Sequence, residues 1–143
     1  MVHLVEIDGG NFREPLHVAT SQKDYVTSTF GMMAIAYARR DQGSTALLIY
    51  DDDIPVGMVM YYEYAEADEY IFGELLIDEK FQHKGYGEKA TKLVLDLMRN
   101  DGKYSKVCLC YIDGNNAAKK LYEKLGFIET DRDDDEIIME RHL

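Results

Sequence analysis

The fold of this chain is most constrained by an apolar strand that leads through a short turn into a helix. The run Tyr70–Asp78 predicts a strand, and helical periodicity runs from Gly85 to about Arg99. The turn between them carries the pattern Gln82-x-x-Gly85-x-Gly87. A strand that passes directly into a helix indicates a layered α/β fold, in which the helix packs against a sheet.

The same turn has the properties of a phosphate-binding site. Helix N-termini expose unpaired N–H groups and the positive end of the helix dipole, and both favour phosphate. Gly85 and Gly87 allow the backbone to approach a pyrophosphate closely, and Lys84 and Lys89 add positive charge. A lone Gly-x-Gly is a weak signal, because an ordinary strand–turn–helix can contain incidental glycines. A P-loop pattern is absent, and a dinucleotide-binding fingerprint would place this strand at the start of the fold.

The other elements predict one mixed sheet with helices on both faces. Further strands are expected at Val2–Ile7, Thr45–Tyr50, Pro55–Tyr62, Ser105–Ile112, Phe127–Thr130 and Glu136–Glu140. Further helices are expected after an Asn11 cap, at Gln22–Arg40 with a break near Gly31, and at Asn116–Leu125 before Gly126. No linker, repeat or low-complexity segment interrupts them, so residues 1–143 are expected to form a single domain.

The charge balance favours a small cationic partner. The chain has 16 basic and 27 acidic residues, a net charge of −11, which repels a polyanion such as DNA and attracts small cations. An excess of acidic residues also keeps proteins in solution, so the charge alone does not decide between a cationic partner and a solubilising role. No run approaches the ~18–20 apolar residues that span a bilayer, and the first residues lack the pattern of a signal peptide. We therefore expect a cytoplasmic protein with no nucleic-acid or membrane partner.

The two cysteines are expected to be buried structural thiols. Cys108 and Cys110 point to one face of their predicted strand, too far apart for an ordinary disulfide. Two thiolates without nearby histidines also make a poor zinc site, so we expect no metal.

Two segments together identify a family. Ile77–Gly87 resembles the acetyl-CoA signature of the GNAT superfamily of N-acetyltransferases, whose core is Arg/Gln-x-x-Gly-x-Gly/Ala. The segment Asn115-x-x-Ala118-x-x-Leu121-Tyr122-x-x-x-Gly126-Phe127 resembles that family's last helix and the strand after it. They lie in the family's order, one strand apart, and the resemblance covers nearly the whole chain. It implies the GNAT fold, an α/β fold with a mixed, mostly antiparallel sheet of six to seven strands, and acetyl-CoA as cosubstrate.

The resemblance also implies which residues bind the cofactor. In this family the strand before the phosphate loop splays from its neighbour, and the pantetheine arm pairs with its exposed backbone. The amides from His83 to Glu88 would bind the pyrophosphate, and Asn115 would contact the cofactor arm. The implied cofactor-binding residues are Leu76, Ile77, Gln82, His83, Lys84, Gly85, Tyr86, Gly87, Glu88 and Asn115.

Two residues are candidates for proton transfer. Tyr122 occupies the family's usual general-acid position, where a phenol can protonate the departing thiolate; the alternative is a core aromatic residue. Glu74 precedes the apolar run Leu75–Ile77 and is expected to be partly buried. Burial raises a carboxyl pKa, which suits a base that accepts the proton of the attacking amine. The alternatives for Glu74 are a structural or an acceptor-binding carboxylate.

The acceptor is the least constrained part. Glu74–Gly87, Gln22-x-x-Tyr25-Val26 and the short acidic tail most resemble bacterial spermine/spermidine acetyltransferases. The acidic loop Glu63–Glu69 is expected near the acceptor entrance, where its carboxylates and neighbouring tyrosines would meet ammonium groups, although it can equally be a solvated loop. Another amine (an amino acid, an aminoglycoside or a protein N-terminus) and a non-catalytic acetyl-CoA sensor remain open. Ile137–Met139 would either fill the core or join two copies in a homodimer, as C-terminal strands often do in this family.

Overall fold

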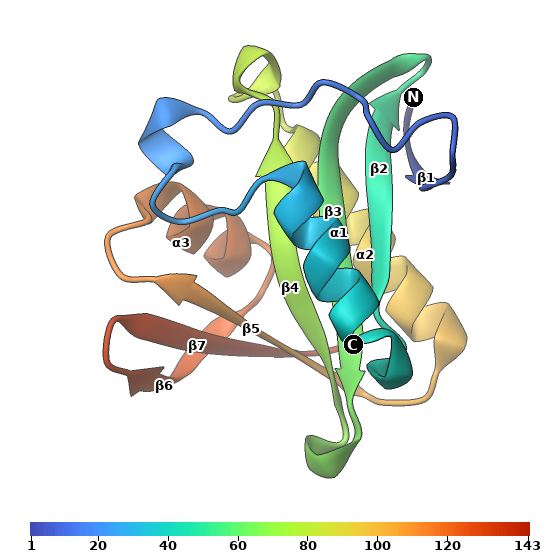
Figure 1. Ribbon diagram of the computed structural model, residues 1–143. Coiled ribbons are helices and arrows are strands. Elements are labelled where there is room, and N and C mark those ends of the chain that lie inside the picture. The colour runs from blue at the N-terminus through green and yellow to red at the C-terminus, as the bar shows by residue number, and fades with distance from the viewer.

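The strands form one sheet in the order β1-β2-β3-β4-β5-β7-β6, in a computed structural model that describes residues 1–143 (Figure 1). Neighbouring strands are antiparallel except β4 and β5, which are parallel. The strands are β1 Val2–Glu6, β2 Thr45–Asp51, β3 Ile54–Tyr64, β4 Glu69–Ile77, β5 Lys106–Ile112, β6 Ile128–Asp133 and β7 Glu136–His142. The predicted mixed, mostly antiparallel sheet is confirmed.

Helices lie on both faces of the sheet, as predicted. They are α1 Thr29–Ala38, α2 Tyr86–Asp101 and α3 Asn116–Lys124. On one face Met32 of α1 packs with Met58 and Met60 of β3, and on the other face α2 and α3 enclose the larger core. Figure 1 shows α1 in front of β3 and β4 and α2 behind them. None of these helices has the length and apolar character needed to cross a membrane.

The prediction of a short helix capped by Asn11 is wrong. The Asn11 side chain instead accepts a hydrogen bond from the Asp8 amide at 2.8 Å and donates one to the Glu6 carbonyl at 2.8 Å. The Asp8 carboxylate in turn accepts bonds from the Gly10 and Asn11 amides. Local side-chain bonds of this kind compete with helix formation and hold the segment in a turn.

The predicted helix Gln22–Arg40 is shorter than expected. A 3-10 turn covers Thr20–Gln22, and the α-helix begins only after Ser28, whose hydroxyl accepts from the Gly31 amide at 3.1 Å. Ser28 is therefore an N-cap, a role for which serine is favoured. The expected break at Gly31 does not occur, because Gly31 lies in the first turn of the intact helix.

Strands β4 and β5 separate along their length. They pair only at Tyr70–Val107 and Ile71–Cys108, and beyond these pairs the two strands diverge (Figure 1). This is the splay that the family resemblance implies. Because α2 follows β4 and α3 follows β5, the opening between the strands lies beside the first turns of both helices.

The C-terminal strands complete the sheet beyond β5. Ile137 and Met139 are buried in the main core. Of the two roles expected for Ile137–Met139, these two residues have the role of filling the core. Cys108 is buried as predicted, but Cys110 is exposed, which contradicts its predicted burial. The reason is that α1 packs over β2 and β3, which leaves the same face of β5 and β7 without a helix above it.

Candidate active site

The opening between β4 and β5 leads into a cavity of about 850 Å³. Its walls come from the segment before α1, the ends of β4 and β5, the turn before α2, and α3. The predicted site residues that line it are Glu74, Leu76, Ile77, Gln82, His83, Gly85, Tyr86, Gly87, Glu88, Asn115 and Tyr122. Of the predicted residues, only Lys84 is not part of the lining.

The turn before α2 presents a row of free amides to this cavity. His83 has φ +62° and Gly85 has φ +82°, and these two left-handed residues redirect the chain into α2 with Gly85 as N-cap. The first bond of the helix runs from the Lys89 amide to the Gly85 carbonyl at 3.1 Å, and the amides from His83 to Glu88 donate to no acceptor in the chain. Unpaired amides at a helix N-terminus form an anion site.

Asp78 fixes the start of this turn. Its carboxylate is buried and accepts bonds from the Lys80 amide at 2.9 Å and the His17 amide at 2.8 Å. It therefore caps the 3-10 turn Glu79–Phe81 and ties it to the N-terminal segment. The sequence patterns did not single out Asp78, although an aspartate that ends a buried strand is itself a capping signal.

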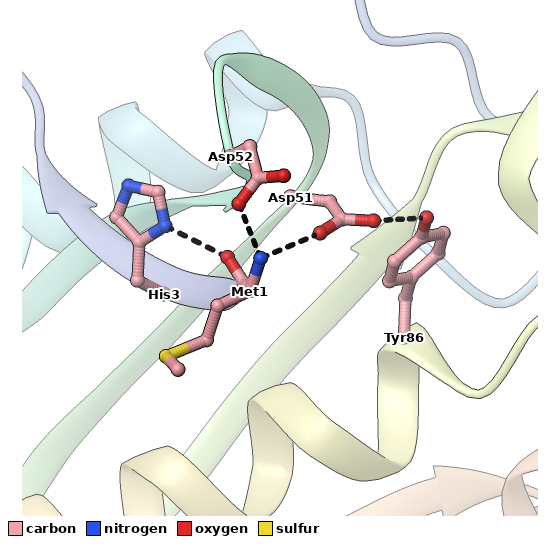
Figure 2. Close-up of polar contacts among 5 residues, drawn as sticks. All are labelled: Met1, His3, Asp51, Asp52 and Tyr86. Atoms are coloured by element: carbon pink, nitrogen blue, oxygen red, sulfur yellow. Dashed lines mark hydrogen bonds and ion pairs between the residues drawn. The ribbon is translucent and has the colours of Figure 1, made fainter.

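Tyr86 anchors the start of α2 to the end of β2 (Figure 2). Its hydroxyl donates to the Asp51 carboxylate at 2.7 Å, and Asp51 pairs with the terminal ammonium of Met1 at 3.2 Å. The bond from Tyr86, followed by the bond from that ammonium, lowers the pKa of Asp51. Sequence reasoning missed Asp51, because no local signal links it to Tyr86, 35 residues further on.

The cations of the cavity come from α3 and not from the predicted lysines. The Lys84 ammonium lies 5.7 Å from the Phe81 ring centroid, and Lys89 is also absent from the lining. Lys120 and Lys124 of α3 line the cavity instead. The four-residue spacing of Lys120 and Lys124 puts both on one side of a helix, and this spacing is the sequence signal that could have identified them.

Glu88 is held between two of the cations near the turn. Its carboxylate pairs with Lys124 at 2.6 Å and with Lys92 at 2.8 Å. The bonds from Lys124 and then Lys92 lower the pKa of Glu88 to about 2. Glu88 therefore ties the first turn of α2 to α3, on opposite sides of the cavity mouth.

Asn115 has a structural role in addition to its place in the cavity. Its side chain caps α3 by accepting from the Ala118 amide at 3.3 Å, and it exchanges two bonds of 3.3 Å with the Gln22 side chain. The pair with Gln22 joins α3 to the segment before α1. This contact closes one side of the cavity, and its two residues lie 93 positions apart in the chain.

Tyr122 is buried, and its hydroxyl makes no hydrogen bond within the chain. Its ring makes edge-to-face contacts with Phe72 and Phe127, at centroid distances of 5.9 and 5.7 Å. Burial, and next the negative charge of Glu74, raise the pKa of Tyr122. A phenol with a raised pKa stays protonated at neutral pH, which is the state that a proton donor requires.

A β-bulge aims Glu74 at the same cavity. On β3 and β4 the paired residues are Tyr61 with Phe72 and Met60 with Glu74, so Gly73 is an extra residue in β4. The bulge puts Glu74 on the α1 face of the sheet, with Met60. The Thr27 amide donates to the carboxylate at 3.3 Å. Burial raises the pKa of Glu74, and the bond from Thr27 opposes this.

Comparison with known proteins agrees with this geometry. Residues 10–127 match the model of the acetyltransferase (GNAT) family. The chain belongs to this family. A spermine/spermidine N(1)-acetyltransferase of Bacillus subtilis (strain 168) is 28% identical to this acetyltransferase over 118 residues, 78% of this chain and 76% of that one.

Solved structures share the fold of this GNAT acetyltransferase at low identity. An acetyltransferase from Thermus thermophilus superposes with a TM-score of 0.81 at 17% identity, over 99% of this chain and 97% of that one. A spermidine N-acetyltransferase from Vibrio cholerae, solved in complex with CoA and spermine, gives 0.75 at 18% identity, over 99% and 94%. The predicted GNAT fold is therefore confirmed.

The acidic segment Glu63–Glu69 does not lie at the cavity, contrary to the prediction. Its first two residues end β3 and Glu69 begins β4, and the hairpin connection between them, with the 3-10 turn Ala65–Ala67, is at the end of the sheet opposite the turn before α2 (Figure 1). Glu63 pairs with Lys103 at 2.6 Å, and the buried Glu69 pairs with Lys106 at 3.2 Å. Strand direction explains the error: β4 begins at the acidic segment and ends at the cavity.

One group of side chains has the spacing of metal ligands. Ligand atoms of Glu69, Cys108 and Glu140 lie within 4.8 Å of one another. The Lys106 ammonium already pairs with both carboxylates, at 3.2 and 3.5 Å, and burial raises the pKa of the Cys108 thiol to about 12. Because one ammonium bridges the two carboxylates and the thiol is protonated, these side chains form an ion-paired structural cluster.

Proposed function

We propose that this acetyltransferase moves the acetyl group of acetyl-CoA to a primary amine of a polyamine such as spermidine or spermine. The observation that carries the proposal is the meeting, in one cavity, of a row of free amides, the Tyr122 hydroxyl and the Glu74 carboxylate. The amides suit the donor's phosphates, and the two side chains suit the two proton transfers of the reaction.

On the donor side, the amides from His83 to Glu88 bind the pyrophosphate, aided by the positive end of the α2 dipole. Lys120 and Lys124 supply the positive charge nearby. The pantetheine arm enters between β4 and β5 and pairs with the backbone of Leu76 and Ile77. This assignment is supported by the early end of the pairing between the two strands.

The two side chains serve the two ends of one direct transfer. Glu74 accepts a proton from the amine, directly or through a water, and the neutral nitrogen attacks the thioester carbonyl carbon. The C–N bond forms, the C–S bond breaks, and Tyr122 donates its proton to the departing sulfur; the proton that the new amide nitrogen loses returns to the Tyr122 phenolate. The raised pKa values of both groups support these roles, because Glu74 becomes a stronger base and Tyr122 remains protonated.

Three observations support a polyamine as acceptor. The net charge is −11, which attracts cations. Two carboxylates that line the cavity, Glu74 and Glu136, have no Lys or Arg partner in the chain. The curated relative from Bacillus subtilis is named for spermine and spermidine.

The test is thiol release from acetyl-CoA with a panel of amines: spermidine, spermine, lysine, an aminoglycoside and a peptide with a free N-terminus. We expect the highest kcat/KM with the two polyamines. A higher value with any of the other amines would replace the polyamine assignment by that class. A parallel thermal-shift measurement with acetyl-CoA reports cofactor binding, and binding without turnover on any amine would favour a sensor over an enzyme.

A further inference from the structure

Glu136 brings a second carboxylate without a cationic partner into the cavity, from the far side of the opening. It is the first residue of β7 and lies opposite Ile112 of β5, two positions from the pair Cys110–Ile138. Glu136, Cys110, Tyr111 and Ile112 all line the cavity. Because directly opposed residues of antiparallel strands share a face, Glu136 projects on the same side of the sheet as Cys110.

That side is also the side of Glu74. Cys108 lies beside Ile71 in the parallel pair, and Ile71 lies opposite Tyr62, two residues from the Met60–Glu74 pair. Glu74 and Glu136 therefore face the same space, one before and one beyond the opening that divides the sheet. Their strands are separated by β5, so the two side chains start at least about 10 Å apart.

The surroundings of Glu136 leave its charge without a partner. Every lysine or arginine ion pair in the chain involves other carboxylates, and no hydrogen bond engages the Glu136 side chain. The helix α1 does not cover this part of the sheet, so the carboxylate is exposed at the cavity wall. Burial, and next the charge of Glu136, raise the pKa of the Cys110 thiol, which agrees with a carboxylate close to it.

The Tyr122 hydroxyl marks the end of the cavity at which the proposed transfer takes place. It lines the cavity from α3 and makes no hydrogen bond within the chain, and Glu74 is close enough to raise its pKa. An amine that reacts between Tyr122 and Glu74 extends the rest of its chain along the cavity. One direction of that extension runs across the opening toward Glu136.

We propose that Glu136 binds the ammonium group of the acceptor that does not react, and so selects diamines and polyamines over monoamines. The inference rests on the proposed transfer to an amine. Glu74 accepts the proton of the reacting nitrogen, and Glu136 holds the distant charged nitrogen through an ion pair across the opening. The apolar walls at Tyr111 and Ile112 contact the methylene groups between the two nitrogens.

The test compares octane-1,8-diamine with octylamine, two acceptors of equal length that differ in one ammonium group, and includes spermidine. For Glu136→Gln we expect KM to rise about fivefold for the diamine and for spermidine, as an exposed ion pair implies. KM for octylamine and kcat for all three should not change. The Glu136→Gln effect should shrink at high salt, because screening weakens exposed charge pairs.

Glu140→Gln is the matched control. Glu140 lies on the same strand and the same face and carries the same charge, but it pairs with Lys106 and does not line the cavity. A similar rise of KM in both variants, or an equal rise for diamine and monoamine, would overturn the assignment of Glu136. Either result would leave the amine acetylation itself intact.

Calorimetric titration of spermidine into the protein–CoA complex gives a readout that does not depend on turnover. We expect Glu136→Gln to weaken this binding about fivefold and Glu140→Gln to leave it unchanged. Equal affinity of the parent and Glu136→Gln would overturn the inference. Failure of the parent protein to acetylate any amine would instead contradict the proposed function, and the inference with it.

Discussion

Tyr122 combines a packed ring with a hydroxyl that has no partner in the chain. The ring contacts Phe72 and Phe127, and these contacts do not depend on the hydroxyl. Replacing a tyrosine by phenylalanine at such a site removes the proton donor and keeps the packing. Catalysis and stability therefore separate at this residue.

Tyr122→Phe should lower kcat by about 100-fold, the usual contribution of a general acid, and should leave acetyl-CoA affinity and the melting temperature nearly unchanged. Steady-state kinetics, cofactor titration and thermal melting measure the three quantities. Tyr104→Phe is the control, because Tyr104 is a half-buried tyrosine that packs on Tyr70 outside the cavity. A fully active Tyr122→Phe enzyme would refute the acid assignment.

Glu74→Gln should lower kcat by a similar factor and remove the acidic limb that Glu74 contributes to the pH profile. Burial raises the pKa of this carboxyl, so that limb lies above the ordinary value of 4.5. A glutamine side chain at position 74 can still accept the hydrogen bond from the Thr27 amide, and this preserves the local structure. Rate measurements across pH, with Glu66→Gln at the opposite end of the sheet as control, test this; an unchanged acidic limb contradicts the role of base.

Glu74→Gln is expected to lower activity but not the stability of the fold at neutral pH. When the native pKa of a carboxyl is raised, the unfolded chain ionises first as pH rises, so the fold loses stability up to the native pKa. Glu74→Gln should therefore be at least as stable as the parent at neutral pH. Below the ordinary pKa of 4.5 the difference should disappear. Thermal melting at both pH values measures it.

Residues within one motif were accessible to sequence reasoning, and residues that meet across the fold were not. Tyr122 and the turn Gln82–Gly87 belong to local patterns, and both reach the cavity. Asp51 contacts Tyr86, and Glu136 lines the same cavity as Glu74, only because elements distant in sequence come together in the fold. Neither spacing nor composition contains that information.

Among the elements, α2 carries a left-handed glycine at each end. Gly85 precedes it with φ +82°, and Gly102 follows it with φ +68°. A side chain at either position meets the same backbone cost of about 1–2 kcal/mol. Only Gly85 faces the cavity, and its added Cβ would have no atom within 4 Å.

Gly85→Leu and Gly102→Leu should therefore be destabilised by similar amounts, and only Gly85→Leu should lose acetyl-CoA binding. The leucine at position 85 would occupy the space that we assign to the pyrophosphate. Chemical unfolding and cofactor titration of both variants check this. Normal acetyl-CoA affinity in Gly85→Leu, or an equal loss of affinity in both variants, would contradict the assignment of the pyrophosphate site to this turn.

Elements with a strong period were predicted well, and the capped N-terminal segments were not. The amphipathic α2 and α3 lie within a few residues of their predicted ranges. The helix α1 starts seven residues later than expected, at Thr29 instead of Gln22, because Ser28 is its N-cap and marks where the helix begins. Asn11 lies in a turn and not in a helix, because local side-chain hydrogen bonds outweigh a weak helical pattern there.

At the scale of the whole molecule, the order of elements matched the family and led to the correct sheet. The bulge at Gly73 and the end of the β4–β5 pairing were beyond single-residue patterns, because each depends on the register between strands. The homodimer, the cytoplasmic location and the lack of nucleic-acid or membrane partners stay predictions. The unpaired edge of β6 is the surface on which a second copy would be sought first.

The divergence of β4 and β5 has a consequence for folding free energy. A sheet whose middle is joined by two residue pairs lacks part of its hydrogen-bond ladder, and on the proposed binding mode the pantetheine arm occupies that missing strand. A ligand that binds only the native state adds to the free energy of unfolding, by about 2.7 kcal/mol at a concentration 100 times its Kd. The cosubstrate then acts as a structural component, and the durability of the fold follows the supply of its own acetyl donor.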